Sequence, residues 1–329
     1  MSRQPLPRRS KLAIAAAAAV MALALPGASA WAAPVLGASS TALANGIAGS
    51  TSTTSLPGYE ASNSSANQLA GKASANSFAN DYSAYVVRSL AEGKGASTAH
   101  AQLLYTLTNN SGVAQNYSMS FHIYGGSIST NLANPLLGAL TGAESLGAQY
   151  AASIKIGGTT LFSTAATVMR SATGTTGSQS GTILNAADDV TDGAYSWGSG
   201  DYVVSLGLLA DGASLAILAE LDGAATADVG TYVFNGGGGY GGCGYGGYNT
   251  VTPSNNRRAQ VALVDCFKGT ANAFYGDPSN FFGDPRDGEF DNLVRFVGVP
   301  ASGAVPEPGS LLLAALALAG AAAARRKRS

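Results

Sequence analysis

Residues 100–129, HAQLLYTLTNNSGVAQNYSMSFHIYGGSIS, alternate apolar and polar side chains on both sides of a turn-forming cluster. A period of two is that of a β-strand, in which every second side chain points to the same face. The cluster Asn109-Asn110-Ser111-Gly112 is rich in turn residues, so the sequence predicts an antiparallel hairpin here. The apolar faces of its two strands are Leu103, Tyr105 and Leu107, then Tyr117, Met119, Phe121 and Ile123.

Similar patterns recur further along the chain. SIKIGGTTLF has Gly157-Gly158 at a position for a tight turn with positive φ. DYVVSLGLLADGASLAILAEL predicts a further strand pair around Asp211-Gly212, and Thr231–Phe234 and Ala259–Phe267 predict two more strands. About eight strands with short turns and no alternation with helices favour an antiparallel β-sandwich, jelly-roll or Ig-like, over residues 99–300.

Residues 33–98 lack such a pattern. Ala33–Lys72 is rich in Ala, Ser, Thr, Gly and Asn without apolar periodicity. We expect a low-complexity lead-in that is partly disordered, with a short helix around Ser77–Ala91.

The first 32 residues have the layout of a secretory signal peptide. Four basic residues (Arg3, Arg8, Arg9 and Lys11) precede the apolar run Leu12–Leu25, and small residues follow, so that cleavage is expected after Ala30 or Ala32. The alternative is a membrane anchor, but a transmembrane helix needs about 20 apolar residues and this run is shorter.

The last residues combine three features in a fixed order: Pro306-Glu307-Pro308, the apolar run Leu311–Ala324 and the basic cluster Arg325-Arg326-Lys327-Arg328. A basic cluster beside an apolar helix stays on the cytoplasmic side of a membrane. Residues 305–329, after a linker at 301–304, resemble the PEP-CTERM sorting signal. The resemblance implies recognition by an exosortase in a Gram-negative bacterium, transient insertion in the inner membrane, and a cell-surface or secreted product.

The resemblance also extends loosely into the middle of the chain. YTLTNNSGVAQNYSMSFHIYGG is similar to strand pairs of other PEP-CTERM proteins, which supports a β-sandwich and implies no activity. The run Thr51-Ser52-Thr53-Thr54 is a single patch with no repeat, so it does not resemble an ice-binding array.

The charge of residues 33–305, which we call the passenger, argues against some partners. Eight of the 18 Lys and Arg residues lie in the two terminal segments, so residues 33–305 hold 10 basic and 18 acidic side chains. This balance disfavours binding to nucleic acid or to an anionic membrane. The chain has two cysteines, and in an exported protein an even count favours one disulfide, Cys243–Cys266.

The sequence offers little for catalysis. Of the two histidines, His122 is expected to face solvent and His100 to lie at a strand start, and neither an HExxH nor a GxSxG motif is present. We therefore expect a non-enzymatic structural or adhesive protein associated with exopolysaccharide or biofilm. A polysaccharide-binding module and a secreted carbohydrate-active enzyme are the alternatives, and Trp197 is the one tryptophan that remains after signal cleavage at Ala32.

Two segments allow both a structural and a functional interpretation. Gly236–Tyr248 fits a long hairpin loop, or an adhesive tip that offers Tyr240, Tyr245 and Tyr248 to sugar rings. Acidic residues cluster at Asp277, Asp284, Asp287, Glu289 and Asp291, and again at Asp188, Asp189 and Asp192. Such clusters bind Ca²⁺ or simply form turns, so we expect either no cofactor or weakly bound calcium.

Overall fold

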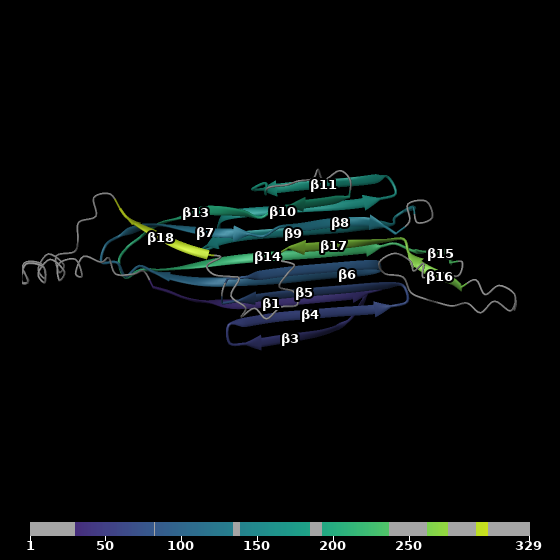
Figure 1. The fold of residues 1–329 in the computed structure, drawn as a ribbon, viewed down its shortest axis with the longest axis horizontal. Coiled ribbons are helices and arrows are strands. Elements are labelled where there is room, and N and C mark those ends of the chain that lie inside the picture. The colour runs from purple at the N-terminus through teal and green to yellow at the C-terminus, as the bar shows by residue number, and fades with distance from the viewer. Residues whose placement is uncertain are drawn as a thin grey trace, which may run out of the picture.

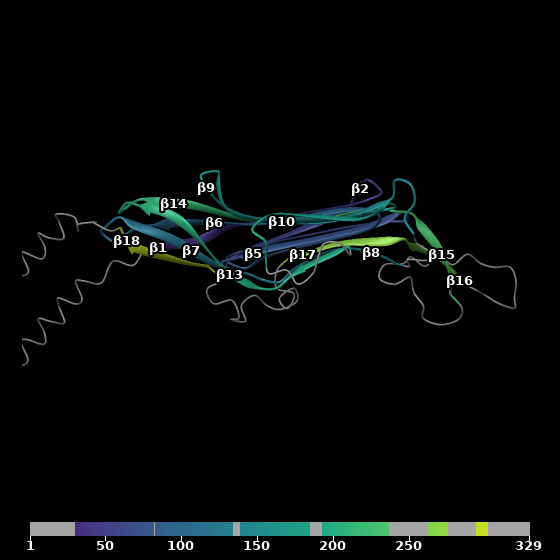
Figure 2. The ribbon, with the colours of Figure 1, turned by 90° about the horizontal axis from the view of Figure 1, so that it is seen from above.

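The computed structural model describes residues 30–81, 83–133, 139–184, 193–236, 262–275 and 294–301. Within these ranges the chain forms β-strands and turns and contains no helix. The strands pack as two layers, seen edge-on in Figure 2, and all of their pairings are antiparallel. The predicted antiparallel β-sandwich is confirmed, with more strands than the eight expected.

The first layer has six strands. In order across the sheet they are β11 (Gly174–Gly181), β10 (Thr159–Ser171), β9 (Ser145–Ile156), β14 (Ser214–Asp228), the second part of β6 (Tyr85–Thr108) and β1 (Ala30–Ala44) (Figure 1). The short strand β2 (Ile47–Ala48) pairs with the end of β1.

The second layer contains the first part of β6 at its centre. Its order is β3 (Ser50–Leu56), β4 (Tyr59–Gln68), β5 (Gly71–Asn80), β6, β17 (Gly269–Tyr275), β8 (Gly126–Leu132) and β12 (Ala194–Trp197). A three-stranded sheet continues this layer lengthwise: β13 (Gly200–Leu209), β7 (Gln115–Ile123) and β18 (Val294–Pro300). Only two residues separate β7 from β8, and only two separate β12 from β13. The three-stranded sheet and the larger sheet are therefore consecutive parts of one layer, with a short break in the strand pairing between them.

The core lies between the layers and contains the predicted apolar faces. Leu103, Tyr105 and Leu107 are fully buried, and the β7 residues Tyr117, Met119, Phe121 and Ile123 face them from the other layer. The Tyr105 and Phe296 rings meet edge to face at 5.7 Å, and the Phe121 and Phe162 rings do so at 5.1 Å. Edge-to-face pairs of this kind stabilise a core beyond the area that they bury.

Strand β6 belongs to both layers because it crosses between them at Gly93–Gly95. Gly93 has a φ of +62°, and a Cβ on it would lie 2.5 Å from the Ala70 carbonyl oxygen and from the Phe267 ring. A Cβ on Gly95 would lie 2.1 Å from the Lys72 carbonyl oxygen. Only glycine fits at such close approaches and takes up positive φ without strain.

The predicted hairpins at Asn109–Gly112 and Asp211-Gly212 are wrong. Strand β6 pairs with β1 and β14, whereas β7 pairs with β13 and β18, so β6 and β7 lie in different layers. The turn at Asp211-Gly212 likewise carries the chain from β13 to β14 in the other layer. Of the three predicted turns, the one at Gly157-Gly158 does close a hairpin, between β9 and β10, with φ values of +53° and +85°.

The buried side chain of Asn109 explains these crossings. Its Nδ2 donates to the carbonyl oxygens of Val113 (2.8 Å) and Leu209 (2.9 Å), and its Oδ1 accepts from the Tyr117 hydroxyl (3.2 Å). Its backbone N–H donates to Ala213 O, and its carbonyl accepts from the Gly212 N–H. Asn109 therefore ties together the β6–β7 and β13–β14 connections, both of which pass from one layer to the other.

The predicted lead-in is instead part of the sandwich. Residues 33–80 form β1 to β5, and the short helix expected around Ser77–Ala91 is wrong, because β5 and β6 cover this stretch. Alanine and serine alternate here, and their small side chains let β1 lie directly over β4 and β5. Buried Ala42, Ala44, Ala66 and Ala73 form a cluster between the layers, and the Ser40 and Ser62 hydroxyls are 2.8 Å apart.

We predict that Asn109→Ala destabilises the fold by about 3–5 kcal/mol, because it leaves several buried partners without a hydrogen bond at about 1–3 kcal/mol each. The neighbouring residue Asn110 is exposed, so Asn110→Ala is the matched control and is expected to change stability by no more than about 0.5 kcal/mol. Urea unfolding of the three proteins measures the difference. Equal midpoints for the two variants would contradict the role given to Asn109.

Candidate functional site

Both termini of the described chain lie at one end of the sandwich, which we call the terminal end. Ala30, the first residue of β1, pairs with Thr108 at the end of β6. The Ala301 N–H donates to the Ala114 carbonyl oxygen at 3.1 Å, just before β7 begins. Thr108 and Ala114 flank the connection that contains Asn109, so β1 begins and β18 ends at this same end (Figure 1).

The opposite end, which we call the distal end, carries a separate hairpin. Strands β15 (Thr231–Gly236) and β16 (Ala262–Phe267) pair with each other, and Figure 2 shows them at the end far from β18. The second part of β6 runs from Gly95 at this end to Thr108 at the other, a distance of about 45 Å at about 3.3 Å per residue. Gly236 is the last described residue of β15, and the rest of the segment Gly236–Tyr248, including its three tyrosines, lies outside the described residues.

Glu144 holds the distal end together. Its Oε2 accepts hydrogen bonds from Lys268 Nζ and the Thr141 N–H, both at 2.8 Å, and its Oε1 accepts from the Gly230 N–H at 2.8 Å. These contacts join three connections: the turn before β9, the turn between β14 and β15, and the residue between β16 and β17. Burial alone would raise the pKa of this carboxyl, but the hydrogen bonds from Lys268, Gly230 and Thr141 outweigh it and lower the pKa to about 2.

Ser39, His100 and Asp222 lie in one row across three neighbouring strands of the first layer. His100 Nδ1 is 2.8 Å from Asp222 Oδ1, and this hydrogen bond is the main reason why the pKa of His100 is raised. His100 lies inside β6, so the expectation that it sits at a strand start is wrong. Ser39 Oγ makes no hydrogen bond to His100 in the part of the chain that the structure describes. A raised pKa also favours the imidazolium, which cannot accept a proton from a nucleophile.

His122 lies on the outer face of the second layer, opposite the buried side chains of β7, as predicted. Its Nδ1 is 2.8 Å from Asp201 Oδ1 on β13, and its ring meets the Tyr124 ring edge to face at 4.7 Å. Both histidines are therefore paired with an aspartate on a neighbouring strand, one on each outer face of the sandwich. This arrangement stabilises strand pairing.

Trp197 lies in the core rather than on a sugar-binding surface. It is buried, its ring is 4.2 Å from the Tyr150 ring, and Tyr195 and Tyr275 complete the cluster. Its Nε1 donates to the Tyr124 carbonyl oxygen at 3.2 Å. Sugar rings stack on exposed aromatic faces, and this face is covered by other side chains.

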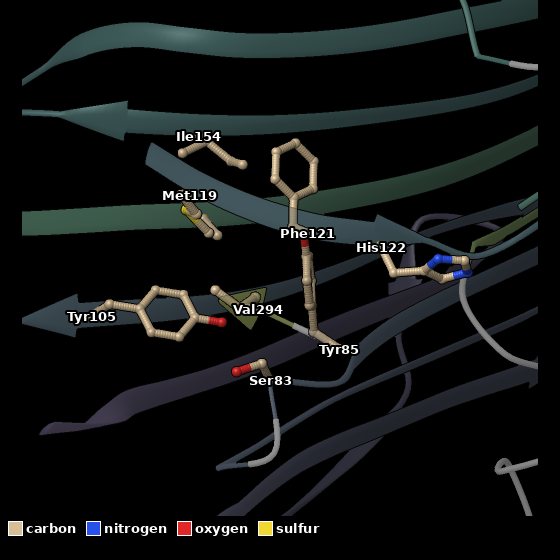
Figure 3. Close-up of a pocket in the computed structure, with 9 residues that line it drawn as sticks. Ser83, Tyr85, Tyr105, Met119, Phe121, His122, Ile154 and Val294 are labelled. Atoms are coloured by element: carbon tan, nitrogen blue, oxygen red, sulfur yellow. The ribbon is translucent and has the colours of Figure 1, made fainter. Parts of the chain in front are cut away.

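A pocket between the layers is lined by Ser83, Tyr105, Val294 and neighbouring core residues (Figure 3). It has room for about one water molecule, so it cannot admit a sugar ring. Tyr85 also lines it, and burial raises the pKa of its hydroxyl to about 12, which keeps the phenol neutral at physiological pH. The pocket has the features of a packing gap in the core.

The other predicted site residues fall outside the described ranges. These are the sorting residues Pro306–Pro308 and Arg325–Arg328, the acidic residues of 188–192 and 277–291, and Cys243. Among the described residues no group of three or more His, Cys, Asp or Glu side chains is placed to hold a metal ion. Cys266 is fully buried and is not a free thiol, but its predicted partner Cys243 is not described, so that pairing stays a prediction.

A family model, described as the PEP-CTERM protein-sorting motif, matches residues 304–328. The chain carries a PEP-CTERM sorting motif. The match covers the proline pair, the apolar run and the basic cluster in the order read from the sequence, and the PEP-CTERM motif implies export, recognition by an exosortase and a membrane-anchored sorting signal in the cell envelope.

Two further findings concern the rest of the chain. No curated protein matches the chain. Within the described ranges no helix is long and apolar enough to cross a membrane, and the apolar run of the PEP-CTERM motif is not part of these ranges.

We predict that Glu144→Gln makes the distal end less stable at neutral pH and flattens its response to acid. A carboxyl whose pKa is lowered on folding stabilises the protein above its usual pKa of about 4.5, and this stability is lost as the pH falls from there towards about 2. Between pH 7 and pH 2.5 the melting temperature of the wild type should therefore fall more steeply than that of Glu144→Gln. Glu60→Gln, at an exposed hydrogen bond to Ser55, is the control. Parallel curves for wild type and Glu144→Gln would contradict this assignment.

We also predict that Cys243 and Cys266 form a disulfide in the exported protein. Closure of the loop between them is expected to stabilise the fold by about 3 kcal/mol. Alkylation of unfolded, unreduced protein from the periplasm should label neither cysteine, and reduction should expose both. Labelling of both thiols before reduction would exclude the bond.

Proposed function

We propose that this chain is an exported, non-enzymatic protein of the cell surface or extracellular matrix. In this proposal an exosortase sorts it, and the β-sandwich acts as a structural or adhesive component associated with exopolysaccharide. The observation that carries the proposal is the position of both termini at one end of an elongated sandwich. An apolar segment that lies in a membrane would then hold the terminal end close to the bilayer and leave the distal end, about 45 Å away, directed outward.

The distribution of side chains supports a structural role. Trp197 and many of the large aromatic side chains of the described residues lie in the core, and both histidines are paired with aspartates. The loop between β15 and β16 would be presented farthest from the membrane. Its tyrosines Tyr240, Tyr245 and Tyr248 then offer flat apolar faces to a polysaccharide or another surface.

In this proposal the apolar run of the PEP-CTERM motif is a temporary sorting signal that is removed by processing. Leu311–Ala324 has 14 residues and spans about 21 Å as a helix at about 1.5 Å per residue. The hydrocarbon core of a bilayer is about 30 Å thick, so this segment is a poor permanent anchor. Pro306-Glu307-Pro308 cannot continue a helix, which leaves it extended at the membrane surface where an enzyme can engage it.

We predict that the mature protein from its native host lacks Arg325–Ser329, and intact-mass analysis measures this directly. Replacement of Pro306, Glu307 and Pro308 by alanine should cause the unprocessed form to accumulate in the inner membrane. Alanine replacement of Ser302 and Gly303, just upstream of the motif, is the matched control and should leave processing unchanged. A dominant mature species that keeps the basic cluster would show that the tail is a stable anchor and would overturn the proposal.

A separate assay tests the surface role. Glycan-array binding by wild type and by a variant with Tyr240, Tyr245 and Tyr248 changed to serine should differ if the distal loop is adhesive. The release of reducing ends from polysaccharide, which a carbohydrate-active enzyme would produce, is expected from neither protein. Release by the wild type would replace the structural role with an enzymatic one.

A further inference from the structure

Strand β3 forms an exposed margin of the second layer. It pairs with β4 on one side, and no described strand pairs with its other side. All seven of its residues, Ser50–Leu56, are exposed on both faces. Its sequence STSTTSL contains no charged residue and no proline, and its backbone groups along the free edge are therefore open to pairing with another strand.

Other edge strands of the sandwich carry features that hinder pairing with a strand of another molecule. Strand β1 contains Pro34 at a shift in register between Ala32 and Val35. Strand β13 carries the exposed Asp201 and a second shift between Ser205 and Gly207, and β18 carries Arg295. Proline, charge and bulges are the usual protection of edge strands. Strand β11, the remaining long margin, has three glycines, which weaken a strand.

The hydroxyl side chains of β3 are of a kind that this protein already uses between paired strands. Thr51 Oγ1 donates to Ser64 Oγ on β4 at 3.0 Å. Between β1 and β6 the Thr41 and Thr98 hydroxyls are 2.7 Å apart, and between β6 and β14 those of Thr108 and Ser214 are 2.8 Å apart. Ser and Thr pairs of this type stabilise neighbouring strands.

We propose that β3 is a self-association edge, at which a second copy of this chain pairs antiparallel through its own β3. Residues 50–55 are all Ser or Thr, so every antiparallel register of two such strands places hydroxyl side chains opposite one another. The pairing is two-fold symmetric, which is the commonest symmetry of homodimers. It extends the second layer from one copy into the next.

The direction of β3 determines how the two copies are oriented. Strand β3 runs towards the terminal end, as does β6 in the first layer, where Thr108 lies beside Ala30 (Figure 1). Two antiparallel copies therefore have their terminal ends on opposite sides. Copies held upright in one membrane cannot pair in this way, whereas released copies, or copies on two facing cells, can. This step rests on the proposed function, but the pairing itself does not.

A charge-reversal experiment on the purified full chain in mild detergent tests the pairing. One variant carries Ser52→Lys and Thr54→Lys, and the other carries Ser52→Glu and Thr54→Glu, on the same face of β3. Like charges on paired strands repel, so each variant alone should sediment as a monomer, whereas an equimolar mixture should form heterodimers. An ionic strength of about 0.01 M keeps the charges unscreened, since the Debye length is then about 30 Å.

The control variant carries the same added charge on the outer face of the first layer, as Thr106→Lys and Gln149→Lys, two exposed positions away from any margin. It should associate like the wild type, which is expected to form dimers that increase with concentration. A wild type that stays monomeric at about 100 µM, in the range of weak interfaces, overturns the proposal. So does a lysine variant that still associates alone, a mixture that stays monomeric, or a control that loses association. Processing in the host tests the proposed function independently, because sedimentation does not depend on it.

Discussion

The close approach of backbone to backbone at Gly93–Gly95 is the constraint on which the two-layer arrangement depends. The Lys94 N–H donates to Ala70 O at 2.8 Å, and the Val229 N–H donates to Gly93 O at 2.9 Å, so this crossing is bonded to both layers. Because β6 supplies a strand to each layer, β5 and β17 in one layer and β1 and β14 in the other are positioned by the same strand. At the opposite end the hydrogen bonds of Asn109 perform the equivalent task. The molecule is therefore closed at one end by glycines and at the other by a satisfied buried amide.

How closely the layers pack changes along the sandwich with the size of the side chains. Near Gly37–Ala44 they meet through alanine and serine, with the Ser77 hydroxyl donating to the Ser39 carbonyl at 2.9 Å. Around β7 the space is filled by rings, including Tyr105, Phe121 and Phe162. Small buried residues contribute little hydrophobic free energy each, since this scales with the apolar area removed from water. Buried Ser–Ser and Ser–backbone hydrogen bonds keep the polar atoms in that part satisfied.

These two features explain what the sequence could and could not predict. The alternation of large apolar residues at Leu103–Leu107 and Tyr117–Ile123 predicted the strands and their buried faces correctly, because a period of two is a property of each strand alone. It could not show that the strands pair with other partners, since Asn109-Asn110-Ser111-Gly112 has the composition of a hairpin turn whether its first residue is exposed or buried. Strands β1 to β5 were missed because alanine and serine alternate without a contrast in hydrophobicity. The signal that could have found them is the two-residue spacing of alanines at 42 and 44 and at 73 and 75. The sorting motif could be recognised from the sequence alone, because its proline pair, apolar run and basic cluster follow one another directly along the chain.

The fold also separates the segments that direct the protein from those that hold it together. Cleavage after Ala32 would remove the first three residues of β1, whose pairing with β6 then resumes after the register shift at Val35 and continues to Ala44. At the other terminus the last pair of β18 is Pro300 with Gln115, and Ala301 makes the last backbone hydrogen bond of the described residues, before the sorting motif begins at residue 304. Processing at either terminus therefore breaks few of the strand pairs and none of the contacts of Asn109, Gly93 or Gly95. A passenger built in this way can lose both of its apolar segments at the membrane and keep the same fold after release.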